Sequence, residues 1–111
     1  MTVQTHISGG IEYLDRPGQS DGPVLVLLHG IGSNATSYEP FLDHIAPDFR
    51  VIVWNAPGYG GSEPLAKEWP ETADYAEALK GFLDRLGLDR VLLVGHSLGT
   101  LIAAAFATAH P

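Results

Sequence analysis

The chain has 111 residues, of which 45% are hydrophobic and 17% charged, as expected for one globular domain with a hydrophobic core. The formal net charge of −7 and the lack of a basic patch argue against a nucleic-acid partner. Without cysteine there is no disulfide or thiolate metal site, and no apolar run is long enough to span a bilayer. The N-terminal segment MTVQTHISGG lacks the pattern of a signal peptide, so we expect a cytoplasmic protein without a membrane partner.

The first part of the chain predicts three strands. Val3–Ile7 and Ile11–Leu14 are candidate strands, with a two-glycine turn between them. A polar loop is expected over Arg16–Pro23. The continuous apolar run VLVLLH then predicts a strand buried on both faces over Val24–His29.

Helices and strands alternate along the rest of the chain. Apolar residues at helical spacing predict a helix over Tyr38–Ala46, which precedes a second buried strand over Arg50–Asn55. A longer helix is expected from the N-cap Thr72 to a stop at Gly87, followed by a third buried strand over Val91–Val94. The last helix, Leu98–Ala109, should place Leu98, Leu101, Ile102, Ala105 and Phe106 on one side. This alternation indicates an α/β fold with a mostly parallel sheet flanked by helices.

The segment GHSLGT joins the third buried strand to the last helix. A strand that turns directly into a helix needs a residue with positive φ, and here that residue would be Ser97, with its hydroxyl above the strand ends. Gly95 and Gly99 flank it at positions where side chains would collide within the turn. The pattern is the G-x-S-x-G nucleophile elbow in its strand–turn–helix context. We therefore expect Ser97 to be a nucleophile rather than an ordinary turn serine, at a helix N-terminus that favours negative charge.

Three segments together resemble the α/β-hydrolase superfamily with a serine nucleophile. LLHGIGSNATSY resembles its oxyanion loop, WNAPGYGGS its D-x-P-G-x-G-x-S loop and GHSLGT its elbow, over most of residues 24–103. The resemblance implies that the backbone N–H groups of Ile31, just after Gly30, and of Leu98 form the oxyanion hole. Asn55 stands where the family usually has Asp, at a position that organises the loop and does no chemistry.

The resemblance also implies a general base and an acid that come well after the serine in the chain. Residues 98–111 hold no such segments, so we expect residues 1–111 to be the N-terminal part of a single α/β-hydrolase domain. Such a chain would be a fragment, a truncated gene model or one chain of a split protein, inactive alone. Truncation would leave the strand Val91–Val94 as an unpaired sheet edge, so self-association is expected there.

The expected function of the complete protein is hydrolysis of a small-molecule ester, lactone, thioester or C–C substrate through an acyl-enzyme, without a cofactor or a metal. The serine argues against the relatives that use an Asp nucleophile, such as haloalkane dehalogenases and epoxide hydrolases. The alternative is a non-catalytic ligand-binding module of the same fold, or an inert fragment. An open reading frame beyond Pro111 would favour the enzyme. A genuine stop codon there would favour the non-catalytic module or the inert fragment.

The five histidines are expected to have other roles than that of the base. His29 should shape its loop, and the ring of His96 should point away from the serine toward neighbouring packing. The remaining three, His6, His44 and His110, should be solvated. Trp54 is expected in the core, whereas Tyr59 and Trp69 fit either the core or a substrate cleft.

Overall fold

The computed structural model describes residues 4–19 and 21–111, which form one five-stranded mixed sheet in the order β1-β2-β4-β3-β5. The strands are β1 (Gln4–Ser8), β2 (Ile11–Arg16), β3 (Val24–Leu28), β4 (Arg50–Trp54) and β5 (Leu92–Gly95). The last three are parallel to one another, whereas β2 is antiparallel to both β1 and β4. The expected α/β class is confirmed, with the parallel part limited to three strands. Val3, expected in the first strand, lies outside the described residues.

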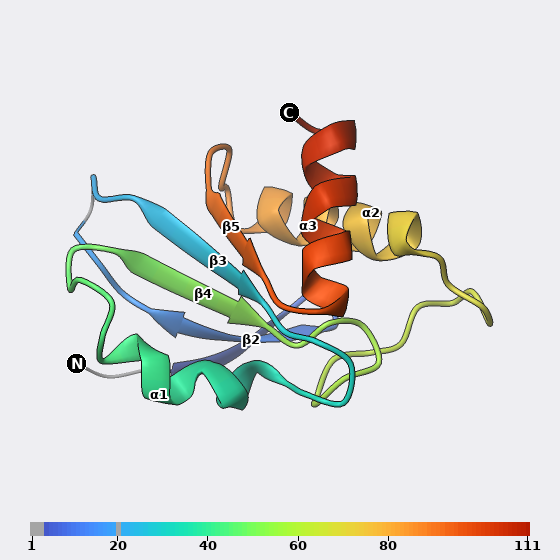
Figure 1. Ribbon diagram of the computed structural model, residues 1–111, viewed down its shortest axis with the longest axis horizontal. Coiled ribbons are helices and arrows are strands. Elements are labelled where there is room, and N and C mark those ends of the chain that lie inside the picture. The colour runs from blue at the N-terminus through green and yellow to red at the C-terminus, as the bar shows by residue number, and fades with distance from the viewer. Residues whose placement is uncertain (1–3, 20) are drawn as a thin grey trace.

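Helices cover both faces of this sheet. They are the 3₁₀ turn η1 (Ala35–Tyr38), α1 (Glu39–Leu42), α2 (Thr72–Arg85) and α3 (Leu98–Ala109). Figure 1 shows η1 and α1 on one side of the sheet, and α2 and α3 on the other. Because side chains alternate along a strand, Val26 and Leu28 of β3 pack toward α2 and α3, while Leu27 packs toward α1.

The two central strands form the core, as their apolar runs predict. Val51, Ile52, Val53 and Trp54 of β4 are fully buried. The indole of Trp54 packs against Phe82 of α2, with ring centroids 6.1 Å apart, so its predicted place in the core is confirmed. Burial on both faces explains why these strands read as continuous apolar runs rather than as alternating ones.

The helix expected over Tyr38–Ala46 is much shorter, and a buried arginine binds the carbonyls at and after its end. Arg16 was expected in a loop, but it is the last residue of β2, with only 4% of its surface exposed. Its guanidinium donates hydrogen bonds to the carbonyls of Leu42, Ile45, Ala46 and Phe49. The Leu42 carbonyl also accepts the Ile45 N–H over 3.3 Å and the Ala46 carbonyl the Phe49 N–H over 3.1 Å, so tight turns follow α1 where the helix was expected to continue. Phe41, one of the apolar residues whose spacing predicts this helix, is 59% exposed.

The boundaries of α2 are close to those predicted. Its N-cap is Glu71, one residue before the expected Thr72, and the Glu71 N–H donates to the carboxylate of Asp74 over 2.6 Å. Gly87 follows the helix with a φ of 72°, which confirms it as the stop.

The strand β5 lies at one edge of the sheet. The prediction that it is buried on both faces is wrong. Leu93 packs with the α2 and α3 side, but Leu92 is 53% and Val94 45% exposed on the opposite face. In α3, Ile102 and Phe106 are buried, whereas Leu101 is 59% exposed instead of facing the core. The edge position confirms the expectation of an unpaired strand, and it explains these exposed side chains, because no element of the described chain covers them.

Candidate active site

Ser97 occupies the sharp turn between β5 and α3. Its φ of 57° and ψ of −118° make it the one non-glycine residue with positive φ in the described part of the chain. The predicted backbone conformation is therefore confirmed. A conformation of this kind costs of order 1–3 kcal/mol and is found preferentially at functional sites. The side chain is exposed and makes no capping hydrogen bond to α3, so its hydroxyl is available to a ligand.

The two elbow glycines are required by contacts with the backbone. A Cβ on Gly95 would lie 2.3 Å from the carbonyl oxygen of Gly99, inside the turn, as the motif predicts. A Cβ on Gly99 would instead lie 2.2 Å from the carbonyl oxygen of Leu28, which belongs to β3. Gly99 thus allows α3 to pack closely on the sheet, whereas Gly95 is the glycine that the tight turn itself requires.

The loop that follows β3 lies beside the serine. The strands β3 and β5 are parallel neighbours, so their carboxyl ends meet at the same edge of the sheet, where the His96 N–H donates to the Leu28 carbonyl over 3.1 Å. Gly30 is buried there, and a Cβ on it would lie only 2.8 Å from the Cβ of Ser97. The structure therefore brings two segments together that are 67 positions apart in the sequence, both predicted to belong to the site.

The backbone amides of Ile31 and Leu98, the two residues predicted as oxyanion donors, donate to no acceptor among residues 4–19 and 21–111. The same holds for the neighbouring amides of Gly30, Gly32 and Ser97. By contrast, the next amides of α3 are engaged, since Gly99 donates to the His96 carbonyl and Thr100 to the Ser97 carbonyl, each over 2.9 Å. The side chain of Ile31 is 73% exposed, so only its main chain contributes to the site.

His29 is buried between the two loops that follow β3 and β4. Its Nε2 accepts the N–H of Ala56 over 3.0 Å, so its Nδ1 carries the proton and donates to the Gly30 carbonyl over 2.9 Å. The ring forms a T-shaped pair with that of Tyr59, with centroids 4.8 Å apart. Burial lowers the pKa of His29 below its usual value of 6.5, and the bond to the Gly30 carbonyl opposes this only in part. With both nitrogens engaged, His29 shapes the loops and is not placed as a base.

The loop from Asn55 to Ser62 is held by Glu12 of β2, a residue that the sequence analysis did not single out. The Glu12 carboxylate accepts from the Asn55 side-chain amide over 2.7 Å and from the Gly61 N–H over 2.8 Å. The Asn55 side-chain oxygen accepts the N–H of Ala35 over 2.7 Å. Ser62 bridges the Asn55 carbonyl and the Glu12 N–H. No local motif could have identified Glu12, because its partners come from a distant loop.

None of the other histidines hydrogen-bonds to the serine hydroxyl in the described structure. His96 is exposed rather than buried in neighbouring packing as expected, and its Nδ1 lies beside Gly30, where an added Cβ would be 3.2 Å from it and 2.8 Å from the Ser97 Cβ. His44 is exposed as predicted, whereas His6 is half-buried and stacks on Tyr13. His110 is also half-buried, and its Nε2 lies 2.7 Å from the Glu77 carboxylate.

The two aromatic residues with an open assignment differ in their surroundings. Tyr59 is half-buried and packs against the core and His29, whereas Trp69 is 78% exposed. Within the described ranges, no helix is long and apolar enough to cross a bilayer, and no group of three His, Asp or Glu side chains could hold a metal ion.

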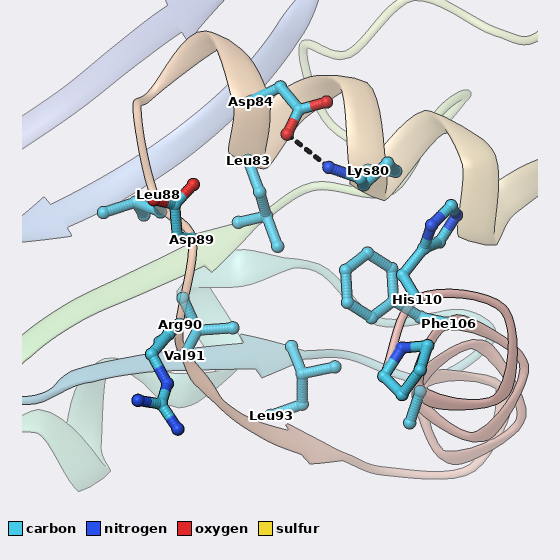
Figure 2. Close-up of a pocket in the computed structure, with 12 residues that line it drawn as sticks. Lys80, Leu83, Asp84, Leu88, Asp89, Arg90, Val91, Leu93, Phe106 and His110 are labelled. Carbon is cyan, nitrogen blue, oxygen red and sulfur yellow. Dashed lines mark hydrogen bonds and ion pairs between the residues drawn. The ribbon is translucent and has the colours of Figure 1, made fainter.

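A hollow of about 650 Å³ lies at the opposite end of β5 from Ser97. Figure 2 shows Leu83, Leu93 and Phe106 around it, with Lys80 bound to Asp84 on its rim over 2.6 Å. Its ionic groups are thus partly paired with one another. Its wall is formed by Val91 and Leu93, on the side of the sheet that faces α2 and α3, and by the ends of these two helices. The chemistry predicted for this chain lies at the other end of the strand.

Known proteins are similar to this chain in sequence and in fold. A 2-hydroxy-6-oxononadienedioate/2-hydroxy-6-oxononatrienedioate hydrolase of Dechloromonas aromatica is 37% identical over 91 residues, which are 78% of this chain and 32% of the relative. The magnesium-chelatase 30 kDa subunit of Rhodobacter capsulatus is 35% identical over 94 residues, which are 85% and 33% of the two chains. The crystal structure of an N-acyl homoserine lactonase superposes with a TM-score of 0.87 at 26% identity, over 99% of this chain and 42% of that one.

The chain spans about a third of the length of the curated relatives it matches. The model of the alpha/beta hydrolase fold family matches residues 23–111, which include both loops around His29 and the whole elbow. The chain therefore belongs to the alpha/beta hydrolase fold family, and its described residues form a five-stranded partial fold.

Proposed function

We propose that this chain carries the nucleophile and the oxyanion hole of a serine hydrolase. The observation that carries the proposal is the backbone of Ser97, whose φ of 57° exposes an unbonded hydroxyl at the N-terminus of α3. The free amides of Ile31 and Leu98 support it, because they lie next to Gly30 and Ser97, which contact each other. Each preorganised donor of this kind is worth about 3–4 kcal/mol in the transition state.

In the proposed reaction, the Ser97 oxygen attacks the carbonyl carbon of a small-molecule substrate. The carbonyl oxygen becomes an oxyanion held by the two amides, and the serine proton passes to a base and then to the leaving group. Water hydrolyses the resulting acyl-enzyme. The substrate class is an ester, lactone, thioester or ketone with a cleavable C–C bond, which includes the lactone and the oxo-acid named for two similar proteins.

The base and its acid partner would come from sequence that corresponds to the remaining two thirds of the relatives. This part of the proposal rests on the histidines of the described chain, none of which hydrogen-bonds to the Ser97 hydroxyl. We expect the 111-residue chain alone to hydrolyse activated esters no faster than its Ser97→Ala variant. Loss of a triad base costs on the order of 10⁶ in kcat, so the remaining rate would be small.

The test is active-site labelling with a fluorophosphonate. The chain is joined to the part of the Dechloromonas aromatica relative that follows the aligned segment, to give what we call the complemented protein. We expect the probe to modify Ser97, and peptide mass spectrometry to find no other modified serine. Labelling that persists after Ser97→Ala would show that the nucleophile is elsewhere.

The second candidate is a hydrolase fold used without hydrolysis. It is favoured by the 35% identity to a protein named as a magnesium-chelatase subunit. The same experiment separates the two candidates, because a non-catalytic module would bind a partner or ligand without acylation of Ser97. A complemented protein that folds but shows neither labelling nor Ser97-dependent ester turnover would favour this second candidate.

A further inference from the structure

We infer that His29 is a positioning residue that sets the direction of the Ile31 N–H, and that it does so through the hydrogen bond from its Nδ1 to the Gly30 carbonyl. The inference rests on the proposed function only in that Ile31 supplies an oxyanion donor. The geometry itself follows from the bonds of the buried imidazole.

The first step concerns the peptide between Gly30 and Ile31. This unit is trans, since the described residues contain no cis peptide bond. In a planar trans peptide the carbonyl and the N–H point in opposite directions. A group that binds the Gly30 carbonyl therefore fixes the direction of the Ile31 N–H, which is left free to bind a ligand.

The second step concerns what holds the imidazole. His29 is 1% exposed, its Nε2 accepts the Ala56 N–H over 3.0 Å and its ring forms a T-shaped pair with that of Tyr59. The ring is thus held by the loop after β4, and the hydrogen bond from its Nδ1 holds the Gly30 carbonyl in a fixed direction. The Ser33 N–H also donates to that carbonyl, over 3.2 Å, but Ser33 belongs to the same turn and moves with it.

Two substitutions separate the two bonds of His29. Asparagine places an amide N–H near the position of Nδ1, so His29→Asn keeps the bond to Gly30 and loses the bond to Ala56. Glutamine places its amide oxygen near the position of Nε2, so His29→Gln keeps the bond to Ala56 and loses the bond to Gly30. Each variant gives up one neutral hydrogen bond of similar strength. A merely structural role would therefore affect both alike.

The geometric test is nuclear magnetic resonance on the ¹⁵N-labelled 111-residue chain. We expect the wild-type imidazole to be the neutral Nδ1–H tautomer. His29→Gln should move the Ile31 amide resonance and speed its exchange with solvent, while His29→Asn leaves that resonance near its wild-type position. Equal perturbation of the Ile31 amide in the two variants, or an Nε2–H tautomer, would overturn the inference.

The kinetic test uses fluorophosphonate labelling of the complemented protein. We expect His29→Gln to slow the modification of Ser97 by about 100-fold, the effect of losing one oxyanion donor, and His29→Asn to slow it far less. Equal slowing would contradict the positioning role. If the wild-type protein is not labelled at all, the proposed function fails, while the resonance of Ile31 still decides the inference about His29.

Discussion

Gly30 lies against the side chain of Ser97 so closely that a Cβ on Gly30 would be 2.8 Å from the serine Cβ. Real Cβ atoms essentially never come that close to another heavy atom, so one of the two groups would have to move. This contact links the loop after β3 to the elbow after β5, and it keeps the free Ile31 amide and the serine hydroxyl in one place.

Gly30→Ala is therefore expected to damage the site more than the fold. The added methyl must displace either Ser97 or the oxyanion loop, and a shift of about 1 Å at a reacting group can cost about 100-fold in rate. We expect such a fall in the rate of fluorophosphonate labelling of the complemented protein. The matched control is Gly81→Ala in α2, where the nearest atom to the new Cβ is the flexible end of Arg85 at 3.4 Å. Equal labelling rates in the two variants would contradict the close contact at Gly30.

The elbow glycines should tolerate valine least. Gly95→Val and Gly99→Val would place a branched Cβ within 2.3 Å of backbone carbonyl oxygens, so we expect each to lower the free energy of unfolding by about 3 kcal/mol or to prevent folding. Gly18, which the sequence suggests as an exposed control, is unsuitable because its Cβ would lie 2.4 Å from the Arg50 backbone nitrogen. Gly81→Val is the appropriate comparison in urea unfolding, and an equal loss there would argue against a steric cause at the elbow.

The buried His29 should make the stability of the chain depend on pH. Burial lowers its pKa in the folded state below 6.5, so the unfolded chain binds a proton first as the pH falls. The stability contributed by neutral His29 is thus complete above pH 6.5 and is lost as the pH falls toward the folded-state pKa, by at most about 1.4 kcal/mol per pH unit. His29→Gln should remove this slope in urea unfolding, whereas replacement of the exposed His44 by Gln should retain it. An unchanged slope in His29→Gln would contradict the prediction.

The neutral amide of Asn55 is expected to be needed at this position because it donates a hydrogen bond to the Glu12 carboxylate. Asn55→Asp would keep the acceptor for the Ala35 N–H but would place a carboxylate against the Glu12 oxygen that now lies 2.7 Å from the amide nitrogen. We expect a loss of about 1–3 kcal/mol in the free energy of unfolding at neutral pH, from one lost hydrogen bond and like-charge repulsion. The double variant with Glu12→Gln should recover most of this loss. Additive effects of the two substitutions would show that the residues are not coupled.

We propose that the uncovered edge of β5 pairs with a second copy of the chain. In antiparallel pairing about Leu93, Leu92 of one copy would lie opposite Val94 of the other on the same face, and both are exposed in the single chain. Such an edge carries neither proline nor charge within β5 to prevent this pairing. Analytical ultracentrifugation should find dimers or larger species, reduced by Val94→Lys but not by Trp69→Lys, which removes another exposed apolar side chain. A monomeric wild-type chain would contradict the proposal.

The sequence by itself determined the alternation of strands and helices, the buried central strands and the strained turn at Ser97. These features depend on residues close together in the chain: apolar runs, helical spacing and the spacing of two glycines around a serine. Local patterns act through backbone sterics and side-chain burial within one element, so they can be recognised without knowledge of what that element packs against.

Only the tertiary structure decided which partners those elements acquire. The guanidinium of Arg16 binds the carbonyls that follow α1, Glu12 anchors the loop of Asn55, and Gly30 lies against Ser97. Each of these contacts joins segments that are far apart in the sequence. The exposure of Leu92, Val94 and Leu101 likewise depends on the neighbours of β5 and α3 rather than on their own apolar pattern. The hydrogen bonds and the burial of a side chain depend on the residues packed around it. The order of the strands in the sheet decides which residues those are.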